Sequence, residues 1–169
     1  MNRHPGAEEN TRGLIERSGL PRGSRIIDLG AGGGESVRLL RSLGFDAEGI
    51  DLEPRGDGVK RDDMLHAPYP DGAFDGVLSQ CAFYLSGDVP AAFAESARLL
   101  RRGGVLMLAD LCFEPWDDIA RRCGLRLLSV EDMTEKWKEY YIEALWRGDA
   151  PCECRRGKCA YYSALFGKD

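Results

Sequence analysis

The chain has 169 residues, which suits one ordinary domain and is too short for two. Hydrophobic residues make up 43% and charged residues 30%, the composition of a globular protein rather than a disordered one. The formal net charge is −5, so we expect no binding to nucleic acid or to an acidic membrane surface. We predict a single domain over residues 1–169.

No segment of the sequence is long and apolar enough to cross a membrane. The longest uninterrupted apolar run is 105–109, whereas a membrane-spanning helix needs about 20 residues. The N-terminal segment is polar and does not have the apolar stretch of a secretory signal peptide. We therefore predict a cytoplasmic protein with no membrane partner. Its six cysteines should be reduced thiols or metal ligands rather than disulfides.

Hydrophobic periodicity predicts strands and helices that alternate along the chain. We expect helices over 11–19, 35–43, 89–102, 116–123 and 132–147, and strands over 25–29, 45–50, a short one near 59, 74–80, 105–111, 125–130 and 159–166. Gly103 and Gly104 should end the third helix, and Asp132 with Glu135 should cap the fifth. Residues 105–111 are the most apolar strand and are expected at the sheet centre. The alternation predicts an α/β fold with a doubly wound sheet.

A glycine-rich turn joins the first predicted strand to the next helix. From residue 26 the sequence reads Ile-Ile-Asp-Leu-Gly-Ala-Gly-Gly-Gly. Glycines are needed where a ligand lies against the backbone, because a Cβ would hold the ligand away. The N-terminus of the following helix adds N–H groups that face the same place. This junction predicts a nucleotide site.

The spacing of these glycines argues against a dinucleotide. A dinucleotide fingerprint reads Gly-x-Gly-x-x-Gly, but here the third glycine comes one residue early at Gly34, and Glu35 takes its slot. Asp28 places a carboxylate beside the turn, which suits a ligand with a positive amino group. Asp51 ends the second strand, where it can accept hydrogen bonds from both ribose hydroxyls. A nicotinamide-dependent oxidoreductase is thus a weak alternative, and the chain has no Tyr-x-x-x-Lys pair.

Four segments in order carry a family resemblance over about residues 11–111. They are 28–34 (Asp-Leu-Gly-Ala-Gly-Gly-Gly), 49–54 (Gly-Ile-Asp-Leu-Glu-Pro), 63–64 with 68–75, and 97–104 (Ala-Arg-Leu-Leu-Arg-Arg-Gly-Gly). Together they resemble the class I S-adenosylmethionine-dependent methyltransferases, and look most like the compact subgroup of quinone-biosynthesis methyltransferases. The resemblance implies a three-layer Rossmann-like fold with a mostly parallel, seven-stranded sheet and an antiparallel last strand. It implies S-adenosylmethionine as cofactor and S-adenosylhomocysteine as product.

The resemblance also implies residues at the methionine end of the cofactor. Gly30, Ala31 and Gly32 would let the methionine and ribose lie on the turn. Asp28 would organise that turn and help to hold the amino group. Ser79, on the fourth predicted strand, would contribute backbone atoms beside the methionine.

For the adenosine end, the resemblance implies that Asp51 binds the ribose hydroxyls and Leu52 packs near the adenine. Asp63 would accept the adenine amino group, with the Met64 N–H at a ring nitrogen; Asp62 is an alternative to Asp63. Only 11 residues lie between Asp51 and Asp63, where the family usually has a full helix. We expect that helix to be missing or reduced to a turn, which would open the adenine side.

No single residue is singled out as a general base, so the catalytic residues stay unassigned. An activated sulfonium needs a base only if the nucleophile is protonated. Candidates for contact with the methyl acceptor are Cys81, Tyr84 and Cys112, which follow or end the fourth and fifth strands. His66 is given a structural or solvent role. The resemblance places the helix over 132–147 as a cover between the last two strands, with Trp137, Tyr140, Tyr141 and Trp146 available to line a pocket.

Three cysteines lie close together near the C-terminus, at Cys152, Cys154 and Cys159. Their spacing fits a thiolate site for a soft metal ion, but the paired Cys-x-x-Cys of common zinc motifs is not present. The alternatives are thiols that bind or sense a substrate, as in arsenite methyltransferases by analogy only, or cysteines without a special role. Basic neighbours should lower the thiol pKa values. Because the implied last strand starts at the cofactor edge, up to five thiols could face one region.

We therefore predict an S-adenosylmethionine-dependent methyltransferase that acts on a small molecule, with residues 131–158 as a helix and cysteine-containing loop over the active site. The alternative is a non-catalytic module of the same fold, which binds a soft metal or docks on a partner through the cysteine loop.

Overall fold

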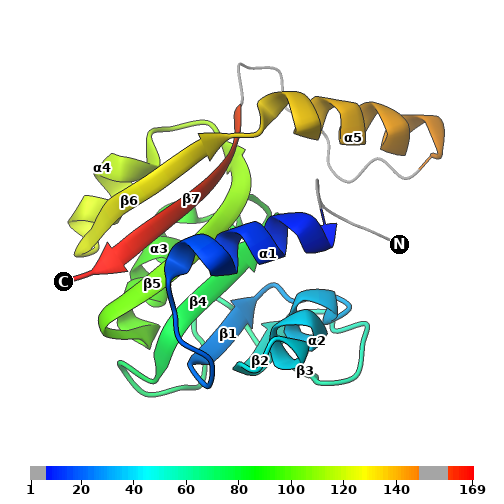
Figure 1. Cartoon of the computed structure of the whole chain (residues 1–169). Helices are drawn as coiled ribbons and strands as arrows, with labels where there is room; N and C mark the ends of the chain where they lie inside the picture. The colour runs from blue at the N-terminus through cyan, green and yellow to red at the C-terminus, as the bar shows by residue number, and fades with distance from the viewer. Residues whose placement is uncertain (1–6, 149–159) are drawn as a thin grey trace.

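The computed structural model describes residues 7–148 and 160–169 as one seven-stranded sheet between two layers of helices (Figure 1). The helices are α1 (Ala7–Ser18), α2 (Glu35–Ser42), α3 (Val89–Leu99), α4 (Trp116–Arg122) and α5 (Thr134–Trp146), with a short 3-10 helix η1 (Tyr84–Ser86). The strands are β1 (Arg25–Leu29), β2 (Asp46–Asp51), β3 (Val59–Arg61), β4 (Phe74–Gln80), β5 (Leu100–Cys112), β6 (Leu125–Asp132) and β7 (Ala160–Lys168).

The strand order in the sheet is β3-β2-β1-β4-β5-β7-β6. All paired neighbours are parallel except β7, which runs antiparallel to both β5 and β6. Cys112, the last residue of β5, lies opposite Ala160, the first residue of β7. The predicted seven-stranded sheet with an antiparallel last strand is confirmed, and β7 begins at the edge where the parallel strands end.

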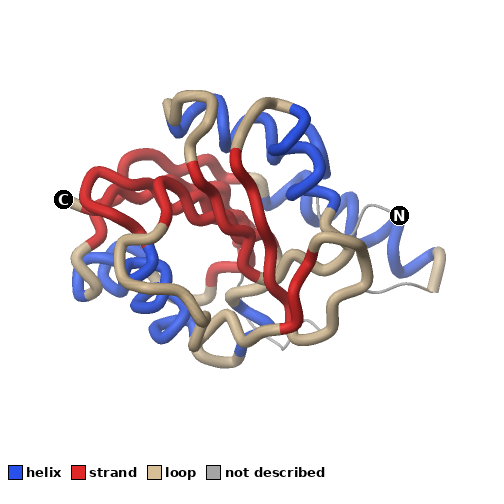
Figure 2. Tube along the Cα trace, turned by 90° about the horizontal axis from the view of Figure 1, so that it is seen from below, coloured by secondary structure: helices blue, strands red, loops and turns tan. Residues whose placement is uncertain are grey.

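The two faces of the sheet are covered by different helices (Figure 2). One apolar cluster joins Leu14 and Ile15 of α1, Val37 of α2 and Trp137 of α5 to β5 and β7. The other joins α3 and α4 to the opposite face, with Phe93 among its fully buried side chains. Strand β5 is buried continuously from Gly104 to Leu111, as expected for a strand covered on both faces.

The sheet reverses its winding between β1 and β4, which are neighbours. After β1 the chain moves through α2 to β2 on one side, and after β4 it moves through α3 to β5 on the other. In open α/β sheets, ligands bind in the crevice outside the carboxyl ends of the strands at such a switch point. The glycine turn that follows β1 and the residues that follow β4 meet there.

Several predicted element boundaries were wrong. The helix predicted to run to residue 102 ends at Leu99, because Leu100 is extended and pairs with Phe74 of β4. Gly103 and Gly104 therefore lie within β5 and do not end the helix. The helix predicted from residue 132 begins at Thr134, because Asp132 ends β6 and pairs with β7.

The predicted Asp132–Glu135 capping pair does not form, since no side chain caps α5. Asp132 instead accepts the Thr134 N–H, at 2.9 Å. The first helix starts at Ala7 rather than residue 11. No helix of the described ranges, 7–148 and 160–169, is long and apolar enough to cross a membrane.

Candidate cofactor site

The glycine turn after β1 is held rigidly by backbone hydrogen bonds. The N–H groups of Gly30 and Ala31 both donate to the Ile50 carbonyl of β2, at 2.9 and 3.0 Å. Gly34 N–H donates back to the Ala31 carbonyl at 2.8 Å. Gly30 has φ +80°, and a Cβ there would overlap the Ala82 side chain. The turn is thus fixed before any ligand binds. The backbone polar groups of Ala31 serve the turn itself, and its predicted cofactor contact remains a prediction.

Asp51, at the end of β2, also stabilises the glycine turn through hydrogen bonds. Its Oδ2 accepts the Gly32 N–H and its Oδ1 accepts the Glu53 N–H, each at 2.8 Å. A carboxylate has about four acceptor positions, so two remain for ribose hydroxyls. The neighbouring Leu52 is 61% exposed, and its contact with the adenine remains a prediction.

The loop after Asp51 replaces a helix, as predicted from the short spacing. No helix lies between β2 and β3. The loop instead lies across the glycine turn: Arg55 N–H donates to the Gly32 carbonyl at 2.9 Å. A Cβ at Gly56 would overlap the Gly33 carbonyl oxygen, so only glycine allows this approach.

Asp28, the buried carboxyl group before the turn, is 4% exposed. Burial raises the pKa of Asp28 to about 7, and the carboxylates of Asp51 and Glu35 act in the same direction. The carboxyl group is therefore held near its titration point where the sequence predicts contact with a positive amino group.

On the predicted adenine side, both candidate aspartates follow β3. Asp63 Oδ1 accepts the Leu65 N–H at 2.8 Å, and its Oδ2 lies 3.5 Å from Nδ1 of the exposed His66. Asp62 N–H donates to the Asp51 carbonyl at 3.1 Å. Met64 is buried beside them. The structure brings these residues to the Asp51 edge, and the choice between Asp62 and Asp63 stays open.

Two polar side chains at the end of β4 are buried with different roles. The Ser79 hydroxyl donates to the Leu29 carbonyl at 2.8 Å and ties β4 to β1. Gln80 was not predicted as a site residue. Its Oε1 accepts the hydroxyls of Thr11 at 2.9 Å and Ser36 at 3.2 Å. A glutamine at the end of an apolar strand, next to the switch point, was the signal in the sequence.

On the predicted acceptor side, Cys81 has a left-handed backbone with φ 56°, which is rare outside glycine. Its Sγ lies 3.2 Å from the hydroxyl of Tyr161, a fully buried residue on β7. The Tyr161 hydroxyl also donates to the Ala109 carbonyl at 3.3 Å. Burial raises the pKa of Tyr161 well above its usual value. The sequence analysis missed Tyr161, because nothing in the sequence pairs it with Cys81.

Several aromatic side chains belong to the apolar cluster that includes Cys81. Tyr84 packs against Phe113 with ring centroids 5.0 Å apart, and its N–H donates to Asp110 Oδ2 at 3.1 Å. Trp137 and Tyr141 of α5 stack at 5.2 Å. Tyr84, Trp137 and Tyr141 all pack in the same apolar cluster as Tyr161.

Helix α5 extends beyond the carboxyl edge of the sheet, near the N-terminal end of α1 (Figure 1). Tyr140 on this helix is partly buried. Trp146, predicted as a possible pocket residue, is 87% exposed and does not line a pocket in the described part of the chain. Its position in the last turn of α5 carries it past the body of the sheet.

Of the five thiols expected in one region, the structure describes two, Cys81 and Cys112, and these two lie on opposite faces of the sheet. Cys112 packs with the cluster on the opposite face from Cys81, and its Sγ donates to the Glu114 carbonyl at 2.9 Å. Burial raises the pKa of Cys112, so the thiol form is favoured there. No group of three metal-ligating side chains occurs within 7–148 and 160–169. Cys152, Cys154 and Cys159 lie outside the described residues.

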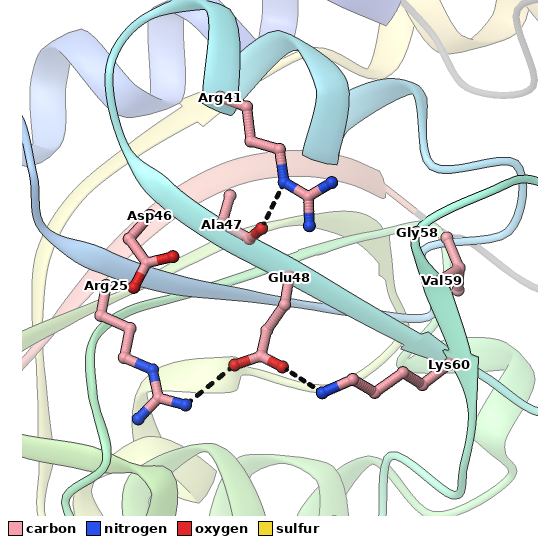
Figure 3. A pocket seen from close by; sticks show the side chains of 8 residues that line it. All are labelled: Arg25, Arg41, Asp46, Ala47, Glu48, Gly58, Val59 and Lys60. Atoms are coloured by element: carbon pink, nitrogen blue, oxygen red, sulfur yellow. Dashed lines mark hydrogen bonds and ion pairs between the residues drawn. The ribbon is translucent and has the colours of Figure 1, made fainter.

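A charged hollow lies beside the first residues of β1 and β2 and beside β3 (Figure 3). Glu48 at its centre bonds to Arg25 at 2.9 Å and to Lys60 at 2.7 Å. Arg41 donates to the Ala47 carbonyl at 2.7 Å. Glu48 thus pairs with two of the three cations that line the hollow, whereas the third, Arg41, is held by a backbone carbonyl.

The fold and this site define the class of protein. A doubly wound sheet with an antiparallel β7, a glycine turn after β1 and a carboxylate after β2 form a Rossmann-like methyltransferase architecture. Residues 3–166 match the family described as "Methyltransferase domain", and the chain belongs to this family.

Curated proteins with similar sequences are also methyltransferases. The chain is 34% identical over 107 residues to 2-methyl-6-phytyl-1,4-hydroquinone methyltransferase of Synechocystis sp., covering 54% of this chain and 33% of that protein. It is 32% identical over 150 residues to malonyl-[acyl-carrier protein] O-methyltransferase of Serratia marcescens, covering 83% and 53%. The chain thus spans between a third and about half of the length of these relatives.

Solved structures share the fold. Phosphoethanolamine N-methyltransferase 2 of Haemonchus contortus, in complex with phosphomonomethylethanolamine and S-adenosylhomocysteine, matches with a TM-score of 0.79 at 18% identity, over 98% of this chain and 53% of that one. A putative sarcosine dimethylglycine methyltransferase of Galdieria sulphuraria matches at 0.75 and 21%, over 94% and 84%. The [4+2]-cyclase SpnF matches at 0.73 and 19%, over 96% and 80%. At these identities the likeness concerns the fold alone.

Proposed function

We propose that this chain binds S-adenosylmethionine at the glycine turn and transfers its methyl group to a small molecule. The observation that carries the proposal is a pair of hydrogen bonds, from Gly32 N–H to the Asp51 carboxylate and from Gly30 N–H to the Ile50 carbonyl. They hold the glycine turn in one conformation at the switch point of the sheet. Membership of the methyltransferase domain family supports it.

The residues present fit this cofactor. Asp51 keeps two acceptor positions for ribose hydroxyls, and Leu52 offers an exposed apolar side chain to the adenine. Asp28 supplies a carboxyl group for the amino group, and Asp63 or Asp62 with Met64 lies by the adenine edge. When bound, the cofactor supplies an activated methyl group on a sulfonium. The chain's own task is then to align the acceptor and to exclude water.

For the acceptor, we propose the side of the site where β4 and β5 end and β7 begins. Cys81, Tyr84 and Tyr161 lie there, with Trp137 and Tyr141 of α5 in the same cluster. These walls are aromatic and apolar, which favours a small acceptor with an apolar or ring-shaped part. Cys112 faces the other cluster, and its contact with the acceptor stays a prediction.

Several expectations remain predictions from the sequence. They are the single domain over 1–169, the cytoplasmic location and the absence of a nucleic-acid partner. The non-catalytic module with a soft metal has no support from the described residues, where no metal cluster occurs.

The test is the affinity for S-adenosylhomocysteine by titration calorimetry in the wild type and in Asp51→Asn. We expect micromolar-range binding by the wild type and at least about tenfold weaker binding by the variant, because an amide keeps only one acceptor oxygen. Asp46→Asn, at the exposed start of the same strand, is the matched control and should bind as the wild type does. Equal affinity of Asp51→Asn would refute the ribose assignment, provided that both variants melt cooperatively.

A further inference from the structure

Two buried amide groups near the glycine turn have no hydrogen-bond partner for their nitrogen atoms. Gln80 is 8% exposed and Asn10 is 7% exposed. Their Nε2 and Nδ2 atoms make no hydrogen bond within the part of the chain that the structure describes. An unsatisfied buried donor costs about 1–3 kcal/mol, so native proteins keep few of them, and those few call for an explanation.

The Gln80 amide is oriented with its oxygen toward two hydroxyl groups. The hydroxyls of Thr11 on α1 and Ser36 on α2 both contact Oε1, at 2.9 and 3.2 Å. The NH2 end therefore faces away from these two hydroxyls. Asn10 directly precedes Thr11 in the first turns of α1, so the second unpaired amide lies at the same end of that helix.

The N-terminus of α2 adds a second, independent indication of a negatively charged ligand. Its N-cap is Gly34, which has no side chain to cap the helix. The first helical hydrogen bond runs from Arg38 N–H to the Gly34 carbonyl, so the N–H groups of the first turn precede it. Ser36, which contacts Gln80, belongs to that first turn. The positive end of the helix dipole and the amide donors thus favour the same kind of group, an oxygen anion.

We propose that Gln80, assisted by Asn10, binds the carboxylate at the amino-acid end of the cofactor. This inference rests on the proposed function. Asp51 accepts a hydrogen bond from Gly32 in the glycine turn. Gln80 contacts Ser36, which lies two residues after the last glycine of the turn, Gly34. A cofactor with its ribose at Asp51 and its chain along the turn brings its carboxylate to the amide nitrogens. Thr11 and Ser36 are positioning residues, because they orient the Gln80 amide.

The experiment compares two probes that differ only in the carboxylate. S-adenosylhomocysteine carries it, and S-adenosyl-3-thiopropylamine, its decarboxylated analogue, keeps the amino group without it. In Gln80→Glu the remaining oxygens can still accept from Thr11 and Ser36, but the donor is lost and a negative charge is added. We expect the Kd for S-adenosylhomocysteine to rise at least tenfold, and the Kd for the analogue to stay unchanged or fall.

Asn10→Leu gives a second variant, since leucine suits a helix and removes the donor. It should weaken only S-adenosylhomocysteine, by about threefold or more. Glu9→Gln, exposed on the same helix, is the control and should change neither Kd.

The outcomes separate this inference from the proposed function. If the wild type binds neither probe, the proposed function itself fails. If the wild type binds both probes and Gln80→Glu weakens them equally, or weakens neither, Gln80 has a structural role and the inference is overturned while the cofactor assignment stands. If Gln80→Glu does not fold, the ratio of the two Kd values in Asn10→Leu decides, and a ratio equal to that of the wild type overturns the inference.

Discussion

Asp28 and Asp51 stand on two sides of the same glycine turn, yet their surroundings differ. Asp51 accepts two backbone N–H groups, which fix the position of its carboxylate. Asp28 is buried among other carboxylates, and its pKa is raised to about 7. In the proposed site the same side chain would serve two tasks: Asp51 would accept hydrogen bonds from hydroxyl groups, and Asp28 would ionise when a positive group binds.

We predict that S-adenosylhomocysteine binds more tightly as the pH rises through about 7. Below that pH Asp28 is protonated, and binding of the amino group must first release this proton. The affinity measured between pH 6 and pH 8 should therefore rise in the wild type. It should be flat in Asp28→Asn, whereas Asp46→Asn should keep the wild-type profile.

Proton release can be measured directly. Calorimetry in two buffers of different ionisation enthalpy should show release of part of a proton near pH 7 by the wild type, and a smaller release by Asp28→Asn. An unchanged profile in Asp28→Asn would assign the titration to another group.

Site residues that lie in one local pattern could be predicted, and those that depend on distant contacts could not. The glycine turn and Asp51 follow directly from two strand ends in the sequence. Gln80 contacts Thr11, which is 69 residues away in the sequence, and Tyr161 contacts Cys81, which is 80 residues away. Only these contacts show that the two residues belong to the site region. The structure was needed because no local pattern encodes such pairs.

At the scale of elements, the loop 53–58 stands where a helix is absent and contacts the glycine turn directly. It lies on the glycine turn through the Arg55 N–H and the close approach of Gly56 to Gly33. Its shortness was predictable from the distance between Asp51 and Asp63, but its contact with the turn was not, since that contact is made by backbone atoms.

We predict that Gly56→Ala destabilises the fold by about 1–3 kcal/mol and weakens cofactor binding together with it. The new Cβ would overlap the Gly33 carbonyl oxygen, so the loop or the turn must shift. Urea denaturation and S-adenosylhomocysteine titration would measure the two effects. Gly13→Ala, in α1 with open space around the site, is the control and should stabilise by up to about 1 kcal/mol. A wild-type melting point for Gly56→Ala would show that the loop is not packed as described.

The helix and strand boundaries show where sequence patterns lose information. The helical spacing after residue 89 continues through Leu100, but pairing of Leu100 with Phe74 draws this residue into the sheet. Likewise, pairing of Asp132 with β7 ends a strand where a helix start was expected. In both cases a contact far away in sequence overrides a local preference, which a single sequence does not display.

At the scale of the whole molecule, the fold limits the chemistry without fixing it. The [4+2]-cyclase SpnF shares this architecture over 96% of the chain. We therefore look for the determinants of the reaction on the proposed acceptor side, where Cys81, Tyr161 and the α5 aromatics lie. In the proposed function the glycine turn would hold the cofactor, and the edge where β7 begins would hold the acceptor.

Two buried carboxyl groups should dominate how the stability of the ligand-free protein changes with pH. Burial raises the pKa of Asp28 to about 7 and that of Asp110 to about 6, although backbone N–H groups of residues 82–84 oppose the shift at Asp110. In the unfolded chain both groups ionise near pH 4. Between pH 4 and pH 7 the folded protein therefore holds protons that the unfolded chain has lost, and its free energy of unfolding falls as the pH rises.

Glu48 and Asp75 act in a separate window. Burial would raise their pKa values, but hydrogen bonds from Lys60 and Tyr69 to Glu48, and from Arg25 and Arg101 to Asp75, lower them. Their contribution to stability is lost only as the pH falls through and below about 4. The two windows together place the maximum of stability near pH 4–5.

We predict that the free energy of unfolding, measured by urea denaturation, is lower at pH 7.5 than at pH 4.5 by roughly 2–4 kcal/mol. Asp28→Asn, which cannot ionise, should lose less stability over this range, whereas Asp46→Asn should behave as the wild type. Saturating S-adenosylhomocysteine should restore about 2.7 kcal/mol at pH 7.5 when present at about 100 times its Kd. Stability that rises from pH 4.5 to pH 7.5 would show that the buried carboxyl groups are ionised throughout, and that the turn holds Asp28 as a permanent charge.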